Sequence, residues 1–454
     1  MPDSAEAEVS VRARAVALPR SVLEGLRSRV RNPFARGLLT VSAGSGAVQL
    51  IGILSAPLTA RVFSPAESGL AGVVTSLIAV CAGVACLRYE QAIPLSASRE
   101  GRLRVMALCL LVLPVLVPLV AVALFFGKAP IVAFLGEPRV APFVMLIPVG
   151  ILLTAVFNIL SHWYTREQDF KAIVQTRLQQ STGQIGFQLS VGFLTGGQAW
   201  VQIVGYLLGF TLGIQGFLRR DWGLIRRIRE AFRWEELRRD ARSYRKFPLY
   251  NSWSSLLDTL APTLPLYVLA SLFGTAEAGH FRMAQMLVTL PIVALSSGIT
   301  SVYWSESARL AQENPGELRR LYLKITWRLV GVGVVLVLGS TVLPFLVPIL
   351  FSPQWKESGY FAIIMAFPAA GSLVASAAVN LSLLNFNHWE SIWIVCRLGV
   401  LITAAGACYF WGLPPRMVLG SLAAVLVVGY VVLVWLNVLA IDRHIGASTD
   451  AGHV

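Results

Sequence analysis

Twelve runs of about twenty mostly apolar residues follow one another between residues 37 and 438. A transmembrane helix needs about 20 such residues, so each run predicts one membrane span. The chain is therefore predicted to be an all-α integral membrane protein with about twelve transmembrane helices. The predicted spans are 37–60, 69–87, 105–127, 142–161, 172–194, 198–218, 248–273, 280–304, 325–350, 359–384, 391–411 and 417–438.

The composition of the chain excludes the main soluble classes. Of its 454 residues, 56% are hydrophobic and 14% are charged, whereas soluble domains carry about 25% charged residues. A soluble enzyme, a disordered chain and a fibre are all excluded on this ground. The net charge of +14 would suggest a nucleic-acid binder in a soluble protein. Here the basic residues lie between apolar runs, where membrane topology explains them, so no nucleic-acid partner is predicted.

Lysine and arginine predict which side of the membrane each loop faces. An even number of spans places both termini on one side. The segments on that side carry 31 of the 38 basic residues, the opposite loops carry five, and Arg282 and Arg397 lie within spans. Because cytoplasmic loops are enriched in lysine and arginine, both termini are predicted to be cytoplasmic.

Two of the basic segments have the pattern of helices that lie on a membrane surface. Ser21 and Glu24 form a capping box ahead of an apolar stripe, and the segment 219–246 places five apolar residues among eleven basic ones. Binding to anionic lipid and ordinary topogenic charge both explain this pattern. The predicted organisation is a basic tail with a short amphipathic helix (1–36), an N-terminal six-helix lobe (37–218), a basic linker (219–247), a C-terminal six-helix lobe (248–438) and a cytoplasmic tail (439–454).

An internal repeat relates the two predicted lobes. The turn Phe63-Ser-Pro-Ala-Glu-Ser-Gly69 follows the first span, and Phe273-Gly-Thr-Ala-Glu-Ala-Gly279 follows the seventh. Each half also holds an even number of spans. These features predict two lobes in parallel orientation, related by an axis along the membrane normal.

Four ionisable residues fall inside the spans or at their edges: Arg177, Asp258, Arg282 and Arg397. A central arginine or aspartate costs about 2.5–3.5 kcal/mol on insertion scales, so such residues usually face a watery interior. Snorkelling to a nearby interface is an equal alternative for Arg177 and Arg282, which lie near span ends. Three of these four residues are arginines and one is an aspartate, and this excess of positive charge favours an anionic substrate.

The fifth span carries a polar stripe within its apolar sequence. Most of its members, which include Gln184 and Gln188, are three, four or seven residues apart and so share one helical face. This face is predicted to line a hydrated cavity. Interhelical hydrogen bonding remains an alternative for the asparagines of other spans that could extend it. The stripe and its extension comprise Gln175, Arg177, Gln180, Ser181, Gln184 and Gln188, with Gln49, Asn158, Asn251 and Asn380.

No motif for enzymatic or metal chemistry is visible. The chain lacks a phosphate-binding GxxxxGK[ST] loop and an HExxH motif. Its five cysteines all lie within apolar runs without a CxxC pair, which favours packing roles. We therefore predict no catalytic residue, no cofactor and no metal site. The cysteines are Cys81, Cys86, Cys109, Cys396 and Cys408.

Four motifs together resemble a known family. They are Arg88-Tyr-Glu-Gln-Ala-Ile93, Trp163-Tyr-Thr-Arg166 with Phe170, Tyr244-Arg-Lys-Phe-Pro248 and Gly279-His-Phe-Arg-Met-Ala284. With these motifs the chain resembles the Wzx-type oligosaccharide-lipid flippases, also called polysaccharide biosynthesis proteins. They belong to the MOP superfamily, which includes the MATE exporters. The resemblance extends from about Arg36 to Ile441.

The resemblance implies a function and a location. It implies a transporter rather than an enzyme, in the bacterial cytoplasmic membrane, whose lobes alternate between inward- and outward-facing states. It further implies an undecaprenyl-diphosphate-linked oligosaccharide as substrate, for lipopolysaccharide or exopolysaccharide, with membrane lipid and other polysaccharide assembly proteins as partners. The family's cationic cavity would be supplied here by Arg177, Arg282 and Arg397, with Gln184 and Gln188 beside them.

Three further expectations remain open at this stage. Arg88 and Glu90 either pair as a cytoplasmic gate or only set topology. Asp258 either carries the coupling ion or balances the charge of Arg282 or Arg397. The competing functions are a MATE-like ion-coupled exporter of small molecules, which needs acidic cavity groups, and a membrane glycan polymerase or ligase, which usually needs a longer outward loop than Lys128–Val140.

Overall fold

The computed structural model describes residues 33–384 and 386–451, and every regular element within these ranges is helical. Each predicted span overlaps one helix of at least 18 residues in the described chain, and these twelve helices confirm the predicted fold class. They are α3 (Pro33–Val62), α4 (Pro65–Ala82), α5 (Arg99–Leu135), α6 (Ile147–Arg166), α7 (Phe170–Thr195), α8 (Ala199–Arg220), α11 (Ser252–Phe273), α12 (Thr275–Glu313), α13 (Pro315–Ser340), α15 (Lys356–Ala375), α17 (Asn387–Phe410) and α18 (Pro415–Ala451).

Nine described helical segments are long and apolar enough to cross a membrane. The amphipathic helix predicted from Ser21 lies outside the described residues. Shorter elements connect the long helices. These are the 3-10 turns η1 (Tyr89–Ala92), η2 (Pro138–Val140), η3 (Val144–Leu146) and η5 (Pro353–Trp355), the π-turn η4 (Phe247–Asn251), and the helices α9 (Gly223–Glu230), α10 (Trp234–Ser243), α14 (Leu343–Leu350) and α16 (Asn380–Leu383).

Two predicted spans are interrupted in the structure. The span 325–350 is divided between α13 and α14, because Pro344 cannot continue the hydrogen bonding of α13 but fits the first turn of α14. The span 359–384 ends early, at Ala375. Beyond it, Asn437 Oδ1 accepts hydrogen bonds from the backbone N–H groups of Asn380 (3.0 Å) and Leu381 (3.3 Å) at the start of α16.

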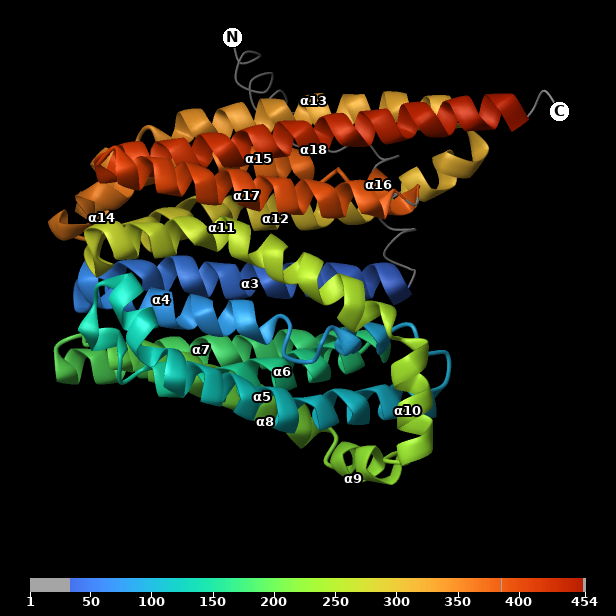
Figure 1. Cartoon of the computed structure of the whole chain (residues 1–454), viewed down its shortest axis with the longest axis horizontal. Coiled ribbons are helices and arrows are strands. Elements are labelled where there is room, and N and C mark those ends of the chain that lie inside the picture. The colour runs from blue at the N-terminus through green and yellow to red at the C-terminus, as the bar shows by residue number, and fades with distance from the viewer. Residues whose placement is uncertain (1–32, 385, 452–454) are drawn as a thin grey trace, which may run out of the picture.

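The long helices run side by side along the longest axis of the molecule (Figure 1). Helices α3–α8, coloured blue to green, form the lower half of the view, and α11–α18, coloured yellow to red, form the upper half. The linker helices α9 and α10 lie at the right-hand end, and α14 lies at the left-hand end. Each linker helix buries one leucine, Leu224 and Leu237 respectively, so the basic linker is packed against the helices rather than free.

The two copies of the internal repeat meet each other where α4 and α12 begin. A methyl group added to Gly69 would lie 1.7 Å from the carbonyl oxygen of Thr275, and one added to Gly279 would lie 1.9 Å from that of Pro65. Only glycine allows two backbones to approach so closely. The contact is reciprocal, as a two-fold axis between the halves requires.

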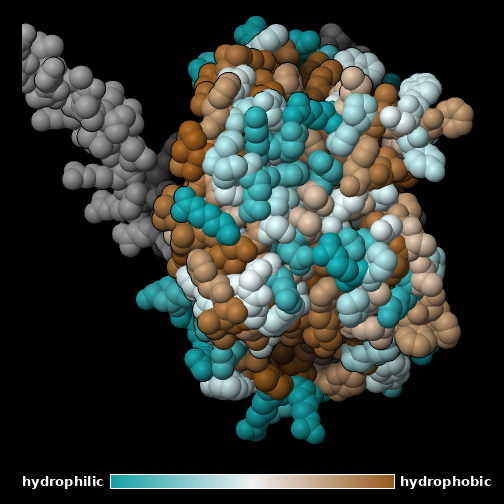
Figure 2. Space-filling view, turned by 90° about the vertical axis from the view of Figure 1, so that its left-hand side faces the viewer, coloured by the Kyte–Doolittle hydropathy of each residue, from teal (hydrophilic) through white to brown (hydrophobic). Residues whose placement is uncertain are grey.

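Further contacts close the two lobes against each other at this end, which is the end predicted to face outward. Trp355 Nε1 donates to the carbonyl oxygen of Ala60 at 2.7 Å, and Gln354 Nε2 donates to the same oxygen at 3.1 Å. Further along α4, Ser76 also joins α4 to α11 through a 3.0 Å hydrogen bond between its hydroxyl group and that of Tyr267. Figure 2 looks onto this end and shows polar side chains, in teal, across the middle of the face.

Candidate functional site

A cavity of about 510 Å³ lies between the two lobes, bounded mainly by α3, α7 and α12. The indole of Trp355 forms part of its wall. No carboxylate is among the described residues that line it, so its polar surface consists of amides, hydroxyls and one guanidinium. The amide and guanidinium groups belong to Gln49, Gln184, Gln188, Gln202, Gln285 and Arg282.

The glutamines of α7 and α8 are held in place by close packing of these two helices. Gln188 Nε2 donates to the carbonyl oxygen of Gln202 at 3.0 Å, and Gln202 Nε2 donates to Ser68 Oγ at 3.0 Å. A methyl group on Gly205 would lie 2.6 Å from Gln188, so the absence of a side chain there makes room for this amide. Hydrogen bonds therefore fix the side-chain amides of Gln188 and Gln202 in the cavity wall.

Arg282 is the one cation among the described cavity residues. It lies in the second turn of α12, and its Nη1 donates to Thr75 Oγ1 of α4 at 3.2 Å. The space for its side chain comes from Gly72, where a methyl group would lie 2.9 Å from Arg282 Cδ. Within the described chain, Arg282 forms no ion pair with a carboxylate. Its positive charge is therefore available to an anion that enters the cavity.

Arg397 and Asp258, the other deep charges of the C-terminal half, lie away from this cavity and bind each other. Arg397 Nη2 is 2.8 Å from Asp258 Oδ1, and the guanidinium lies 4.2 Å from the centre of the Trp393 ring. The side chain of Arg397 is 3% exposed and that of Asp258 is 58% exposed. Arg397 also borders an apolar groove of about 370 Å³ between α17 and α18. The structure thus pairs Asp258 with Arg397 rather than with Arg282.

The remaining charged candidates from the sequence do not line the cavity either. Arg177 is an exposed residue of α7, with its guanidinium 5.9 Å from the centre of the Phe157 ring. Arg88 and Glu90 form an ion pair of 3.7 Å at η1, beyond the end of α4. The structure therefore brings together Gln49, Gln184, Gln188 and Arg282 and separates them from the other charged candidates.

The Arg397–Asp258 pair leads to a prediction about stability. Asp258→Asn should lower the free energy of unfolding by about 3 kcal/mol. This value is the low end of the range for breaking a buried ion pair, because the side chain of Asp258 is partly exposed. The loss arises because Arg397 stays buried without a counter-ion. Thermal unfolding in detergent measures it, and the double variant Asp258→Asn, Arg397→Met should recover most of it. An Asp258→Asn protein as stable as the parent would show that this pairing is not structural.

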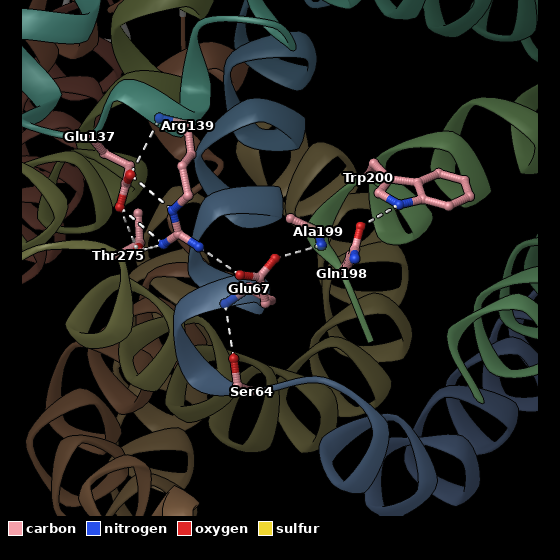
Figure 3. Close-up of polar contacts among 8 residues, drawn as sticks. All are labelled: Ser64, Glu67, Glu137, Arg139, Gln198, Ala199, Trp200 and Thr275. Atoms are coloured by element: carbon pink, nitrogen blue, oxygen red, sulfur yellow. Dashed lines mark hydrogen bonds and ion pairs between the residues drawn. The ribbon is translucent and has the colours of Figure 1, made fainter. Parts of the chain in front are cut away.

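A polar cluster that the sequence did not reveal lies where the repeats meet (Figure 3). Arg139 binds Glu67 at 2.7 Å and Glu137 at 3.0 Å, and Glu67 also accepts a 2.7 Å hydrogen bond from the backbone N–H of Ala199. Thr275 of the other lobe donates to Glu137 at 3.3 Å. Hydrogen bonds from Arg139 hold the pKa of Glu137 below its usual range. The cluster thus links α4, η2, α8 and α12.

The repeat partner of Glu67 has different surroundings. Glu277 Oε2 is buried and has no hydrogen-bond partner among the described residues. Nearby, Arg416 binds Glu357 at 2.6 Å instead. The two halves therefore share a backbone contact but not its polar network. The repetition of glutamate in both turns is the sequence signal that could have pointed to this cluster.

Comparison with known families gives the chain its family. Residues 58–360, about two thirds of the chain, match the family model described as "Polysaccharide biosynthesis protein". The chain belongs to the polysaccharide biosynthesis protein family. The resemblance found in the four motifs is thereby confirmed. No curated protein matches the chain.

Solved structures show that this chain has the MOP fold. The lipid II flippase MurJ in an inward closed conformation is similar, with a TM-score of 0.65, 13% identity and coverage of 89% of this chain and 90% of that one. An inward-facing multidrug resistance MATE transporter is similar with a TM-score of 0.60 and 16% identity, over 90% of this chain and 96% of that one. A MOP superfamily transporter from Pyrococcus furiosus is similar with a TM-score of 0.54 and 15% identity, over 92% of this chain and 98% of that one. Its binding pocket is described as having reverse polarity. The multi-pass membrane fold is therefore established.

Proposed function

We propose that this protein moves a polyprenyl-diphosphate-linked oligosaccharide across the bacterial cytoplasmic membrane. The observation that carries the proposal is the cavity between the lobes, where Arg282 has no described carboxylate partner and five glutamines surround it. An anionic group enters such a cavity more readily than a cation. Amides that donate and accept hydrogen bonds suit a sugar rich in hydroxyl groups.

Each part of the substrate has a match in this arrangement. The planar guanidinium of Arg282 can hold two diphosphate oxygens at once. Gln184 and Gln188 face the space where sugars would lie, and the indole of Trp355 offers them an apolar surface. The polyprenyl tail stays in the bilayer while the head group crosses.

The closed contact between Gly69 and Gly279 supports alternating access. In this state the lobes are joined at the end predicted to face outward, so the substrate would enter from the cytoplasmic side. Separation of α4 from α12 would then open the cavity outward. Both termini lie on the cytoplasmic side in this proposal, as the distribution of basic residues predicts.

The other candidate residues have secondary roles in this proposal. Arg88 and Glu90 act near the cytoplasmic entrance, and Arg177 attracts the diphosphate from the exposed surface of α7. Asp258 is the candidate for ion coupling, through its pair with Arg397. Arg397 would touch the substrate only if that pair opened.

Reconstitution tests the proposal directly. Purified protein in liposomes should move a lipid-linked oligosaccharide between leaflets, so that more of its sugar becomes accessible to an impermeant lectin than in empty liposomes. Deletion of the gene should abolish a surface polysaccharide, and the intact gene should restore it. Equal lectin accessibility with and without protein, together with uptake of an organic cation, would instead favour the exporter.

A further inference from the structure

Three side chains of types that can serve as metal ligands lie together at the end of the N-terminal lobe that carries η1. The sulfur atoms of Cys86 and Cys109 and a carboxylate oxygen of Glu90 all lie within 4.8 Å of one another. All three residues are buried, with exposed fractions of 3%, 0% and 6% respectively. The two cysteines are 23 positions apart in the sequence, so no local spacing motif reveals the cluster.

An unusual turn brings these groups together. Leu87 and Arg88 both adopt left-handed backbone conformations, with φ of 51° and 60°. Such a conformation is unfavourable for a residue other than glycine. The turn directs the chain from Cys86 into η1, so that Glu90 returns toward Cys109 in the third turn of α5. Surrounding contacts must therefore favour this geometry.

The Glu90 carboxylate is the group that points most directly to a bound cation. Its Oε2 atom is buried and has no hydrogen-bond partner among the described residues. Its Oε1 atom is 3.7 Å from Arg88 Nη1, too long for a hydrogen bond. Burial raises the pKa of Glu90. Burial of a carboxyl oxygen without a hydrogen-bond partner is unfavourable, and a bound cation would remove that cost.

We propose that Cys86, Glu90 and Cys109 bind a zinc ion. Two thiolates and one carboxylate are ligands that zinc prefers, and they disfavour the harder magnesium and calcium ions. The three anionic ligands, the dication and the neighbouring Arg88 guanidinium together carry no net charge. This neutrality suits a site shielded from water, where an isolated charge is costly. Binding releases the thiol protons to solvent.

The ion would have a structural effect on the lobe. It joins the segment after α4 to α5 and fixes η1 between them. The neighbouring Tyr89 donates a 3.3 Å hydrogen bond from its hydroxyl to the carbonyl oxygen of Ala241 in α10. The zinc site would thereby hold the basic linker against the N-terminal lobe.

Cobalt titration of the purified full-length protein tests the site without any transport assay. The protein is kept reduced, stripped with a chelator and titrated with Co²⁺, whose thiolate charge-transfer absorption reports cysteine ligation. We expect one Co²⁺ per chain, displaced by Zn²⁺. Cys86→Ser or Cys109→Ser should abolish the absorption. Glu90→Gln should weaken binding by at least about tenfold, because loss of a mere outer-shell partner of a metal ligand already costs about that much.

A matched control separates this cluster from the other thiols. Cys408 is also buried, in α17, with its sulfur 2.9 Å from Ser421 Oγ. Cys408→Ser should bind Co²⁺ as the parent does. Gel filtration and thermal unfolding establish that each variant is folded. Absence of the absorption from the reduced parent protein, or its persistence in a folded Cys86→Ser or Cys109→Ser variant, would overturn the proposal.

Discussion

Arg282→Glu should abolish glycan export while the protein still reaches the membrane at its normal level. Arg282 is the one cation among the described cavity residues, and no described carboxylate pairs with it. Hydrogen bonds to charged groups contribute about 1.5–3 kcal/mol each. Loss of a bidentate pair with diphosphate, and its replacement by repulsion, should therefore weaken binding by at least about a hundredfold. Restoration of the surface polysaccharide and flipping in liposomes both measure this loss.

Variants at the same position separate charge from geometry. Arg282→Lys keeps the charge but loses the planar fork, so it should keep partial activity. Lys171→Glu reverses a charge on an exposed residue of α7 and should leave export unchanged, which controls for net charge. Full export by Arg282→Glu would remove this arginine from the binding site and leave the cavity without its anion-binding group.

The helices and the polar face of α7 could be predicted because both depend on local pattern. Apolar runs predict spans wherever they occur, and Gln184 and Gln188 stand out because amides are rare in such runs. The ends of spans were predicted less well. They depend on groups far away in the sequence, such as Asn437, whose side chain caps α16 and leaves Asn380 fully buried rather than facing a cavity.

The partners of the charged residues could not be predicted, because each pair joins distant parts of the chain. Asp258 and Arg397 are 139 positions apart, and from sequence Arg282 was an equally good partner for the aspartate. Gln202 and Gln285 were missed because neither belongs to a polar stripe like that of α7. Only the packing of α8 and α12 brings them to the cavity.

Gly69→Ala and Gly279→Ala should each open the cavity at the end predicted to face outward. The added methyl groups would meet backbone oxygen atoms at 1.7 and 1.9 Å, and backbone cannot move aside without separating α4 from α12. Overpacking costs about 1–3 kcal/mol, and this cost disappears once the lobes part. The ratio of the closed state to the outward-open state should therefore fall by roughly fivefold to a hundredfold. A thiol at the cavity residue Thr59, in a protein without native cysteines, should react correspondingly faster with an impermeant maleimide added from outside.

The control for these variants is Gly331→Ala, because a methyl group there meets no atom within 4 Å. It should leave both the reaction rate of the Thr59→Cys thiol and export unchanged. The two repeat variants should also lose export, since a transporter held in one state cannot complete its cycle. Because the contact is reciprocal, Gly69→Ala and Gly279→Ala should act alike, and the double variant should add little once the lobes are apart. Unchanged labelling in both single variants would mean that the Gly69–Gly279 contact persists when the cavity opens, and the outward gate would then have to lie elsewhere, at Trp355 and Ala60.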